Sequence, residues 1–549
     1  MLTQDAPRPS PAPPRAAGDE KLLRSARSAS LGTLVSRVLG LVRDVLSAAL
    51  IGAGQHWDAF VIAFTVPNLF RRLFGEGALS SAFVAVHSEH VAKEDHEGAA
   101  RTVNLVATAL TLLLSAIVVA GVLLLAFVPI DRLVAAESRE KAALIASLSA
   151  IMFPYLLLVC LTAFLMAVLN SFGRFGVAAA TPAALNFLWI GVLVAGAVFA
   201  IPATTLVFVL AGVVVVAGFL QIAMLVPSLR KAGVRVRPDF RFRDPALRQV
   251  LALMLPVVLG LAPTQLNVLV DQYIAEAFIP GDGANSALYY GNRLMQFPLA
   301  LIGIAMGTAA FPLLARLAAS NQREAMAGVS NLAMRVAFFV ALPAAVGLFV
   351  LAEPIVRLFF EWGRFGPEAT ARTTPVLAAF ALGVPGFCAL QIVTRAHYAL
   401  RDARTPVRVG LAAMALNVVL NLLLVKPLGA AGLALATSVA ALVNFAALTF
   451  LLRARLGAIG GRFLARSLAR TAALAAAMGL VCAGLAWAAT AALGDASFGA
   501  RAAAVLLPVA GGSLFFAAGA RACRLPEAAD ILASFGRRRA AATAAGGGS

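Results

Sequence analysis

The chain has 549 residues, of which 61% are hydrophobic and 13% charged, and its mean hydropathy is +0.89. No soluble fold of this length could bury so much apolar surface, so the composition excludes a soluble protein and predicts a polytopic helical one. The apolar stretches run continuously over helix-spanning lengths, which argues against alternating β-barrel strands. The net charge of +19 comes from Lys and Arg gathered in alternate loops, a pattern of membrane orientation rather than of nucleic-acid binding.

The two ends of the chain differ from its apolar middle. Residues 1–20 are rich in Pro and Ala and too polar to enter a membrane, which predicts a disordered N-terminal tail. Residues 521–549 are expected to form a C-terminal tail. Between them, counting apolar stretches of about 20 residues predicts an all-α fold of fourteen transmembrane helices. Their approximate limits are 28–51, 57–86, 102–129, 142–171, 176–200, 203–227, 249–279, 285–315, 330–352, 373–394, 406–425, 430–452, 466–489 and 501–520.

The loop charges predict how the chain is oriented in the membrane. Lys and Arg gather before the first span and in the loops that follow even-numbered spans, most densely between residues 230 and 248. Most odd-numbered loops are short and poor in these residues, and the ninth loop (353–372) fits least well. Because cytoplasmic loops carry the excess of Lys and Arg, both termini are expected in the cytoplasm.

Helix-punctuating features recur along the chain at a constant offset of 231 residues. The pairs are Pro67 with Pro298, Pro154 with Pro385, and the two ALN triplets that end at Asn186 and Asn417. This offset predicts two pseudo-symmetric lobes of six helices, an N-lobe at 21–240 and a C-lobe at 241–455. Transporters built in this way bind substrate in a central cavity between the halves. The alternative is chance, since Pro and Ala-Leu are common in such helices; the last two spans, within 456–520, lie outside the repeat.

The first predicted span carries charges within its apolar length, in the stretch SRVLGLVRD. A charge at the bilayer centre costs about 3 kcal/mol on insertion scales, so these groups should face a bundle interior or a wet cavity. On a helical wheel Arg37 and Asp44 share a face, whereas Arg43 lies about 120° from Arg37. Gly40 allows the helix to bend between them. An Arg37–Asp44 salt bridge is therefore expected, with Arg43 left over.

The second and eighth spans repeat this anomaly. In PNLFRRLFGEG, Arg72 and Glu76 are four residues apart and suited to pair, which leaves Arg71 as a ligand candidate. In LYYGNRLMQFP, Arg293 has no nearby acid in its own span. The alternatives are snorkelling of the charges near 71–76 to the interface, and for Arg293 an interhelical pair with Asp271.

The cationic groups outnumber the acids in the first two spans. The arginines are Arg37, Arg43, Arg71 and Arg72, and the carboxylates are Asp44, Asp58 and Glu76. A guanidinium keeps its charge at any workable pH, and its planar fork pairs with phosphate oxygens in bidentate fashion. The surplus therefore predicts an anionic ligand that carries phosphate, with internal salt bridges as the bland alternative.

A second polar set could hold a cation. Asp271 in the seventh span, Asn417 and Asn421 in the eleventh and Thr437 in the twelfth offer oxygen ligands from three helices. Such a set could bind Na⁺ and couple transport to an ion gradient. The alternative is ordinary hydrogen bonding between helices, which Asn and Thr make routinely in membranes.

Motifs of enzymes and pumps are missing from the sequence. It contains no nucleophile–His–acid arrangement, no HExxH or CxxC pair and no phosphate-cradling glycine loop. The five His and four Cys form no spacing typical of a metal site. We therefore expect a transporter rather than an enzyme, with no cofactor unless the cation site is real, driven by a gradient or a membrane potential.

Four long segments carry a family resemblance. SRVLGLVRD, DAFVIAFTVPNLFRRLFGEGALSSAFV, YYGNRLMQFPLALIGIAMGTAAFP and ALRDARTPV resemble the MurJ (MviN) family of lipid II flippases, in the multidrug/oligosaccharidyl-lipid/polysaccharide (MOP) exporter superfamily. The resemblance runs from about residue 24 to the fourteenth span. It implies two six-helix lobes around a central cavity and a groove between the last two helices for the undecaprenyl tail.

The resemblance also implies residue roles. Arg37, Arg43, Arg71 and Arg293 match cavity arginines that bind the substrate, and the acids of the first two spans match groups that switch partners in gating. Asp271, Asn417, Asn421 and Thr437 match a Na⁺ site found in some members, where the position of Asn421 can be acidic. Thr65 stands where a lysine is often found and Gln296 where an acid can follow the arginine, two departures that concern gating.

The function implied is the flipping of lipid II from the cytoplasmic to the periplasmic leaflet of a bacterial inner membrane, by alternating access. The expected partners are the undecaprenyl-diphosphate-linked substrate, membrane lipids and the cell-wall synthesis machinery, and the protein is expected to be a monomer. The alternatives are flipping of another lipid-linked oligosaccharide, or drug export, which should need acidic rather than basic cavity groups. A membrane glycosyltransferase or phosphatase would need a carboxylate or His cluster, which the sequence lacks.

Overall fold

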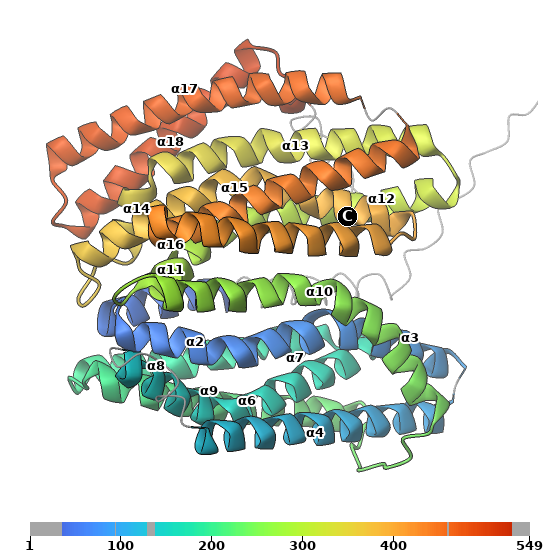
Figure 1. Cartoon of the computed structure of the whole chain (residues 1–549). Helices are drawn as coiled ribbons and strands as arrows, with labels where there is room; N and C mark the ends of the chain where they lie inside the picture. The colour runs from blue at the N-terminus through green and yellow to red at the C-terminus, as the bar shows by residue number, and fades with distance from the viewer. Residues whose placement is uncertain (1–35, 94, 129–137, 458–459, 530–549) are drawn as a thin grey trace, which may run out of the picture.

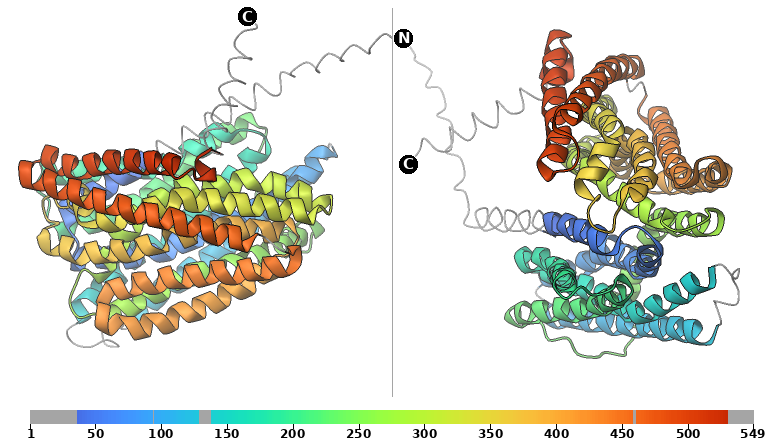
Figure 2. Two further views of the ribbon diagram at one scale, coloured as in Figure 1. Left: turned by 90° about the horizontal axis from the view of Figure 1, so that it is seen from above. Right: turned by 90° about the vertical axis from the view of Figure 1, so that its left-hand side faces the viewer.

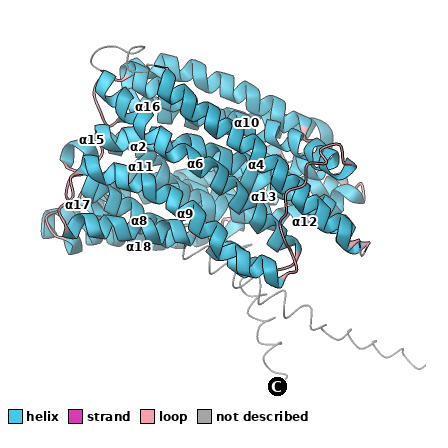
Figure 3. Ribbon diagram, turned by 90° about the horizontal axis from the view of Figure 1, so that it is seen from below, coloured by secondary structure: helices cyan, strands magenta, loops and turns pink. Residues whose placement is uncertain are grey.

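The computed structural model describes residues 36–93, 95–128, 138–457 and 460–529. Within these ranges helices are joined by loops and there is no strand (Figure 3). The expected disordered tail at 1–20 lies outside the described residues, as does most of the C-terminal tail. The described helices form two groups that lie one above the other in Figure 1. This arrangement agrees with the predicted pair of lobes.

The N-lobe begins with a helix at residues 36–51. It continues through α2 (Gln55–Phe70), η1 (Arg71–Ala78), α3 (Leu79–Ala92), α4 (His96–Phe127), α6 (Arg139–Ser171), α7 (Phe175–Ala180), α8 (Ala183–Val198) and α9 (Ala203–Lys231). The central helix α6 packs against α2, α4 and α9, and its buried face includes Tyr155, Leu156 and Phe164. The lobe is thus organised around one long, largely buried helix.

The C-lobe repeats this order of elements. It comprises α10 (Pro245–Phe278), α11 (Ala284–Pro298), η3 (Leu299–Ile304), α12 (Ala305–Ala319), α13 (Arg323–Val350), α14 (Ala352–Phe359), α15 (Pro367–Ala399) and α16 (Arg404–Leu456). Here α15 is the central buried helix, packed against α11, α13 and α16. Helix α10 lies between the lobes, because it packs on α16 of its own lobe and on η1 and α3 of the other.

Both lobes contain a π-helix after an equivalent proline. Pro67 lies in the last turn of α2 just before η1, and Pro298 ends α11 just before η3. A proline inside a helix lacks an N–H and clashes with the carbonyl four residues earlier, so the ladder is disturbed at this point. A local change to i→i+5 bonding accommodates such a disturbance. The two prolines are one of the pairs at the 231-residue offset, so the repeat extends to local backbone geometry.

Eleven helices among the described residues are long and apolar enough to cross a membrane. One of them, α16, contains Gly429 at φ 56° and ψ −137°, a left-handed conformation that glycine tolerates, and the helix kinks there between the predicted eleventh and twelfth spans. The charged segments at 36–51 and 55–92 are not among the eleven. The count of fourteen spans therefore remains a prediction, while the polytopic all-α class is confirmed.

Two helices follow the C-lobe and pack on its outer side. Helix α17 (Gly461–Leu493) lies against α13 and α18 (Phe498–Ala522), and α18 also contacts α14. Figure 2 shows this pair, in red, away from the N-lobe. Leu480 and Trp487 on α17 and Leu514 on α18 are more than 70% exposed, so the pair presents a broad apolar surface to the bilayer.

Candidate functional site at the lobe interface

A buried carboxylate of the N-lobe binds arginines from both lobes. Asp44 is fully buried, and its Oδ1 lies 3.0 Å from Nε and 2.7 Å from Nη2 of Arg43. Its Oδ2 lies 2.5 Å from Nε of Arg293, which comes from α11 in the C-lobe. The Tyr289 hydroxyl, also on α11, donates to Oδ1 at 3.0 Å. We call Arg43, Asp44, Tyr289 and Arg293 the interlobe charge cluster.

The Arg43 side chain is fixed by the N-lobe on its other sides. Its Nη1 donates to Oδ1 of Asn186 at 3.2 Å, and its guanidinium lies 4.8 Å from the ring centre of Trp189, within cation–π range. The Trp189 indole donates to the Ser47 hydroxyl at 3.2 Å. Asn186 and Trp189 are both on α8, so that helix holds Arg43 in place.

Gly40 allows Arg293 to reach this cluster. A Cβ at Gly40 would lie 2.8 Å from Nη2 of Arg293, closer than real side chains approach. The sequence interpretation assigned Gly40 to a bend, but the residue lies within the helix at 36–51, where the absence of a side chain makes room for the guanidinium. The glycine thus serves contact between the lobes.

Three pairing expectations are wrong in the same way. Asp44 pairs with the adjacent Arg43 and with Arg293, while Arg37 is exposed, so the expected Arg37–Asp44 bridge with Arg43 left over is not found. Arg43 can fold back onto its neighbour because its side chain is long, which a helical wheel of Cβ directions ignores. Arg293 has an acid partner after all, and that partner is Asp44 rather than Asp271.

The remaining arginine and acid of the second span lie in or beside η1. Arg71 is half-buried, and its Nε donates to Oδ1 of Asn68 at 3.0 Å. Glu76 is within η1, but its side chain lies outside what the structure describes, so the expected Arg72–Glu76 pair stays a prediction. The structure therefore brings together Arg43, Asp44 and Arg293 of the predicted set.

Asp58 ties the lobes together at a second place. This fully buried carboxylate on α2 accepts backbone N–H bonds from Gly283 and Ser286, both at 2.7 Å, and the Ser286 hydroxyl at 2.6 Å. It therefore caps the N-terminus of α11, where free N–H groups and the helix dipole favour an anion. The nearby N–H of Arg364 also donates to the carbonyl of Ala49 at 2.8 Å, another bond between the lobes.

The sequence interpretation missed Lys141. Its ammonium lies 2.9 Å from Oδ2 of Asp58, 2.9 Å from Oε2 of Glu276 and 3.2 Å from Oδ1 of Asp282. Lys141 is 7% exposed. It stands in the first turn of α6, and a lysine that faces acids across the interface is visible only in three dimensions.

The predicted cation ligands do converge. Asp271 on α10 accepts from Nδ2 of Asn421 at 2.6 Å, and the Thr437 hydroxyl lies 3.4 Å from its other oxygen. Asn417 lies 2.9 Å from Asn421, and turning its amide nitrogen toward Asn267 and Asp271 satisfies both of its polar atoms. The Asn421 oxygen is buried and without a hydrogen-bond partner, so this set offers one free oxygen beside a carboxylate. These residues fit a small cation.

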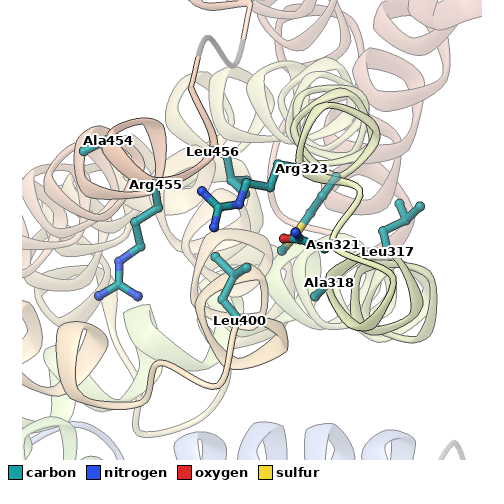
Figure 4. A pocket seen from close by; sticks show the side chains of 9 residues that line it. Leu317, Ala318, Asn321, Arg323, Leu400, Ala454, Arg455 and Leu456 are labelled. Atoms are coloured by element: carbon teal, nitrogen blue, oxygen red, sulfur yellow. The ribbon is translucent and has the colours of Figure 1, made fainter.

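A pocket of about 400 Å³ lies apart from this interface, where the ends of α12, α13, α15 and α16 meet (Figure 4). It is lined by apolar residues of these helices together with Asn321, Arg323 and Arg455. Arg455 is paired with Asp402 at 3.0 Å. Among the described residues, no group of three or more His, Cys, Asp or Glu side chains is arranged for a metal ion.

Two helical lobes that meet at buried ionic contacts, with an extra helix pair on the outside, define a multi-pass membrane transporter. The chain belongs to the lipid II flippase MurJ family, whose model matches residues 47–499. The match covers the N-lobe from residue 47 onward, the whole C-lobe and α17.

Known proteins of this kind are similar over most of their length. The probable lipid II flippase MurJ of Vibrio cholerae is 37% identical over 78% of this chain and 82% of its own. The lipid II flippase MurJ of Burkholderia cenocepacia is 33% identical over 79% of this chain and 84% of its own.

Solved structures show the same fold. A structure described as lipid II flippase MurJ in an inward closed conformation aligns with a TM-score of 0.71 at 23% identity, over 90% of this chain and 99% of its own. An inward-facing multidrug MATE transporter of the MOP superfamily aligns with a TM-score of 0.63 at 15% identity, over 80% of this chain and 99% of its own. The predicted family and the all-α transporter fold are therefore confirmed.

Proposed function

We propose that this chain carries lipid II from the cytoplasmic to the periplasmic leaflet of a bacterial inner membrane. We also propose that the diphosphate of lipid II replaces Asp44 as the anion bound by Arg43 and Arg293. The observation that carries this proposal is the sharing of one buried carboxylate by arginines of opposite lobes. A diphosphate offers the same oxygen geometry with more charge, so it can replace Asp44 as the anion between the lobes. Substrate binding would then break the ionic contact that joins them.

This exchange suits alternating access. Only a ligand with different affinity for two states can shift a conformational equilibrium. In the closed state Asp44 is the shared anionic partner of two guanidinium groups, and separation of the lobes would leave Arg293 without that partner. A bound diphosphate compensates for this loss, so the cost of opening falls when substrate is present.

The other predicted arginines take supporting roles. Arg37 lies two helical turns before Asp44 and is exposed, which suits a first contact with the headgroup as it enters. Arg71 follows Pro67 at the start of η1, where it is half-buried, and a change in the π-helix would change its orientation. Asp58 acts as a gate, because its bonds to the N-terminus of α11 exist only when the lobes are together.

The undecaprenyl tail would remain in the bilayer along α17 and α18. Their outward side chains are apolar, and Gly512 lets the two helices approach, since a Cβ there would overlap the Cys482 sulfur. Small residues at a contact allow membrane helices to pack closely. The headgroup would cross between the lobes while the tail slides along this pair.

The protein is proposed to work as a monomer, as a transporter and not an enzyme, with both termini in the cytoplasm and with cell-wall synthesis proteins as partners. Labelled lipid II should therefore be recovered chemically unchanged after incubation with purified protein. Release of its phosphate or sugar would contradict the transporter assignment. A protease added to inverted vesicles should remove both tails.

The main test is replacement of the native flippase in a depleted bacterial strain. The wild-type chain should restore periplasmic lipid II, whereas Arg43→Ala and Arg293→Ala should each reduce it about tenfold or more, since hydrogen bonds to charged groups contribute about 1.5–3 kcal/mol. Arg241→Gln is the matched control, because Arg241 is exposed and pairs only with Asp239 in a loop. Full activity of both interface variants would overturn the proposed role of the cluster.

The alternative cargoes can be separated by competition. Another undecaprenyl-linked oligosaccharide shares the diphosphate and should compete with lipid II for binding, whereas a cationic drug should not. The fold is also that of MATE transporters, but two arginines at the interface disfavour a cationic cargo. Drug efflux without lipid II transport would contradict the proposal.

We further propose that Asp271 and its neighbours bind Na⁺ and couple its gradient to transport. The unpartnered oxygen of Asn421 beside Asp271 supports this role. In proteoliposomes, an inward Na⁺ gradient should accelerate flipping by the wild type and not by Asp271→Asn. The control is Glu97→Gln, because the Glu97 carboxylate is 85% exposed and pairs with Arg101 on the same helix. An unchanged Na⁺ response in Asp271→Asn would refute the site.

A further inference from the structure

We propose that Lys141 is a positioning residue that holds one end of the lobe interface closed, by neutralising carboxylates contributed by both lobes. Nothing in the family motifs includes it. The inference rests on alternating access as proposed above, and concerns the end of the interface where Asp58 caps α11. The loop charges place this end on the periplasmic side.

The geometry of Lys141 is that of a clamp. Its ammonium carries three donors and lies within 3.2 Å of three carboxylates from separate elements. Asp58 comes from α2 in the N-lobe, whereas Glu276 comes from α10 and Asp282 from the turn between α10 and α11. Lys141 itself comes from the first turn of α6 in the N-lobe. Two of its three ion pairs therefore cross the interface.

The charge balance shows why one lysine matters. Three carboxylates around one ammonium already leave a net negative group, and loss of the ammonium leaves three acids within reach of one another. Arg372, a further cation close to this cluster, lies against Gly283 and pairs with Glu368 at 3.0 Å. Asp58 is the one acid of the three that belongs to the N-lobe, so its repulsion by Glu276 and Asp282 is relieved by moving the lobes apart.

Asp58 and Lys141 make separable contributions. Without Lys141, Asp58 still accepts three hydrogen bonds from Gly283 and Ser286. Glu276 keeps one bond, from Nδ2 of Asn285 at 3.2 Å, and loses its cation. The effect of removing Lys141 is therefore carried mainly by Glu276 and Asp282, and it should be reversed by removing their charges.

The test is a cysteine pair that reports closure of this end. Ala49→Cys and Arg364→Cys join residues whose backbones are hydrogen-bonded across the interface at 2.8 Å, in a chain whose four natural cysteines have been replaced. Lys141→Met should lower the initial rate of disulfide formation about fivefold, a modest shift of a two-state equilibrium. Lys141→Arg should stay near the parent rate.

The decisive variant combines Lys141→Met with Glu276→Gln and Asp282→Asn. Recovery of the parent rate supports a role through charge, and recovery of folded protein lost in Lys141→Met supports it equally. A triple variant as slow as Lys141→Met would overturn the inference, as would an unchanged rate in Lys141→Met. If cross-linking behaves as expected but the parent chain flips no lipid II, the proposed function is wrong. The role of Lys141 in holding the lobe interface closed is then still supported.

Discussion

Asn186 and Asn417 occupy equivalent places in the two lobes, but Asn186 contacts an arginine and Asn417 lies beside an aspartate. Asn186 accepts a hydrogen bond from Arg43 at 3.2 Å, and Asn417, with its amide nitrogen turned toward Asp271, donates to that carboxylate at 3.2 Å. The two asparagines are one of the pairs separated by 231 residues. An amide has both a donor and an acceptor, so one scaffold position can support a cation in one lobe and an acid in the other.

The Asp44 charge should be needed for the stability of the resting protein. Asp44→Asn leaves two guanidinium groups without their anion, and breaking a buried pair in this way costs about 3–5 kcal/mol. Thermal unfolding in detergent should show a large loss of stability, together with loss of flipping. Tyr289→Phe removes the hydroxyl that donates to Asp44 at 3.0 Å and accepts from Arg43 at 3.3 Å, and it should cost about 2 kcal/mol. Equal stability of Asp44→Asn and wild type would contradict the ionic role.

Gly40 should be important for function more than for folding. In Gly40→Ala the new methyl meets the flexible end of Arg293, which can move, so the fold should survive. We expect flipping to fall several-fold because Arg293 is displaced from Asp44. Gly54→Ala is the control, since its Cβ would meet nothing within 4 Å. Similar flipping activity of both variants would show that the close approach of Arg293 to Gly40 is not required for function.

The stability of the protein should depend on pH through the buried carboxylate of Glu527. Burial alone would raise the pKa of this carboxyl, but hydrogen bonds from Ser467 and Arg335 outweigh it and hold the pKa below its usual value. A depressed folded-state pKa stabilises the protein above the unfolded pKa of about 4.3, and the contribution is lost as pH falls through the lower folded value.

Glu527→Gln should therefore cost about 2 kcal/mol at pH 7. The difference from wild type should shrink once the pH falls below about 4. Unfolding measured across this range checks both statements. A difference that is constant with pH would show that the carboxylate charge is not responsible.

Close packing of α17 on α18 should matter for the lipid tail. Gly512→Leu places a bulky side chain against Cys482 and Met478 and should push the helices apart. Binding of lipid II should weaken about tenfold, since a few CH₂ groups at about 0.8 kcal/mol each lose their contact. Gly499→Ala, at a position with open space, should bind normally. Unaltered binding of lipid II by Gly512→Leu would show that α17 and α18 do not bind the lipid tail.

Sequence reasoning succeeded where the signal is local or periodic. The apolar spans, the prolines at the 231-residue offset and the buried charges of the first span could all be recognised from residue order. Arg43 and Arg293 were both singled out from the sequence, and both contact a buried carboxylate in the structure, while their role in substrate binding stays a prediction. The four cation-site candidates also meet in the structure, although their ligand is untested.

The pairings could not be predicted, because they depend on how the lobes meet. Arg293 and Asp44 are far apart in sequence, and no periodicity connects them. Lys141 is a single charge at a helix start, and the acids it binds come from three other elements. Thr65 is a similar case, since its bond to Gln272 of α10 at 2.8 Å became apparent only from the fold. Contacts between repeats follow from docking rather than from either repeat alone.

The π-helices after Pro67 and Pro298 have a mechanical consequence. A π turn contains an extra residue, so conversion between π and α geometry changes the register of everything downstream by one residue, about 100° of rotation. Arg71 opens one of these segments, and α3 and α12 follow them. Each lobe thus contains a π-helix at the same point of its fold. Conversion of that π-helix to α geometry would rotate the helix that follows it while the helix that precedes it keeps its orientation.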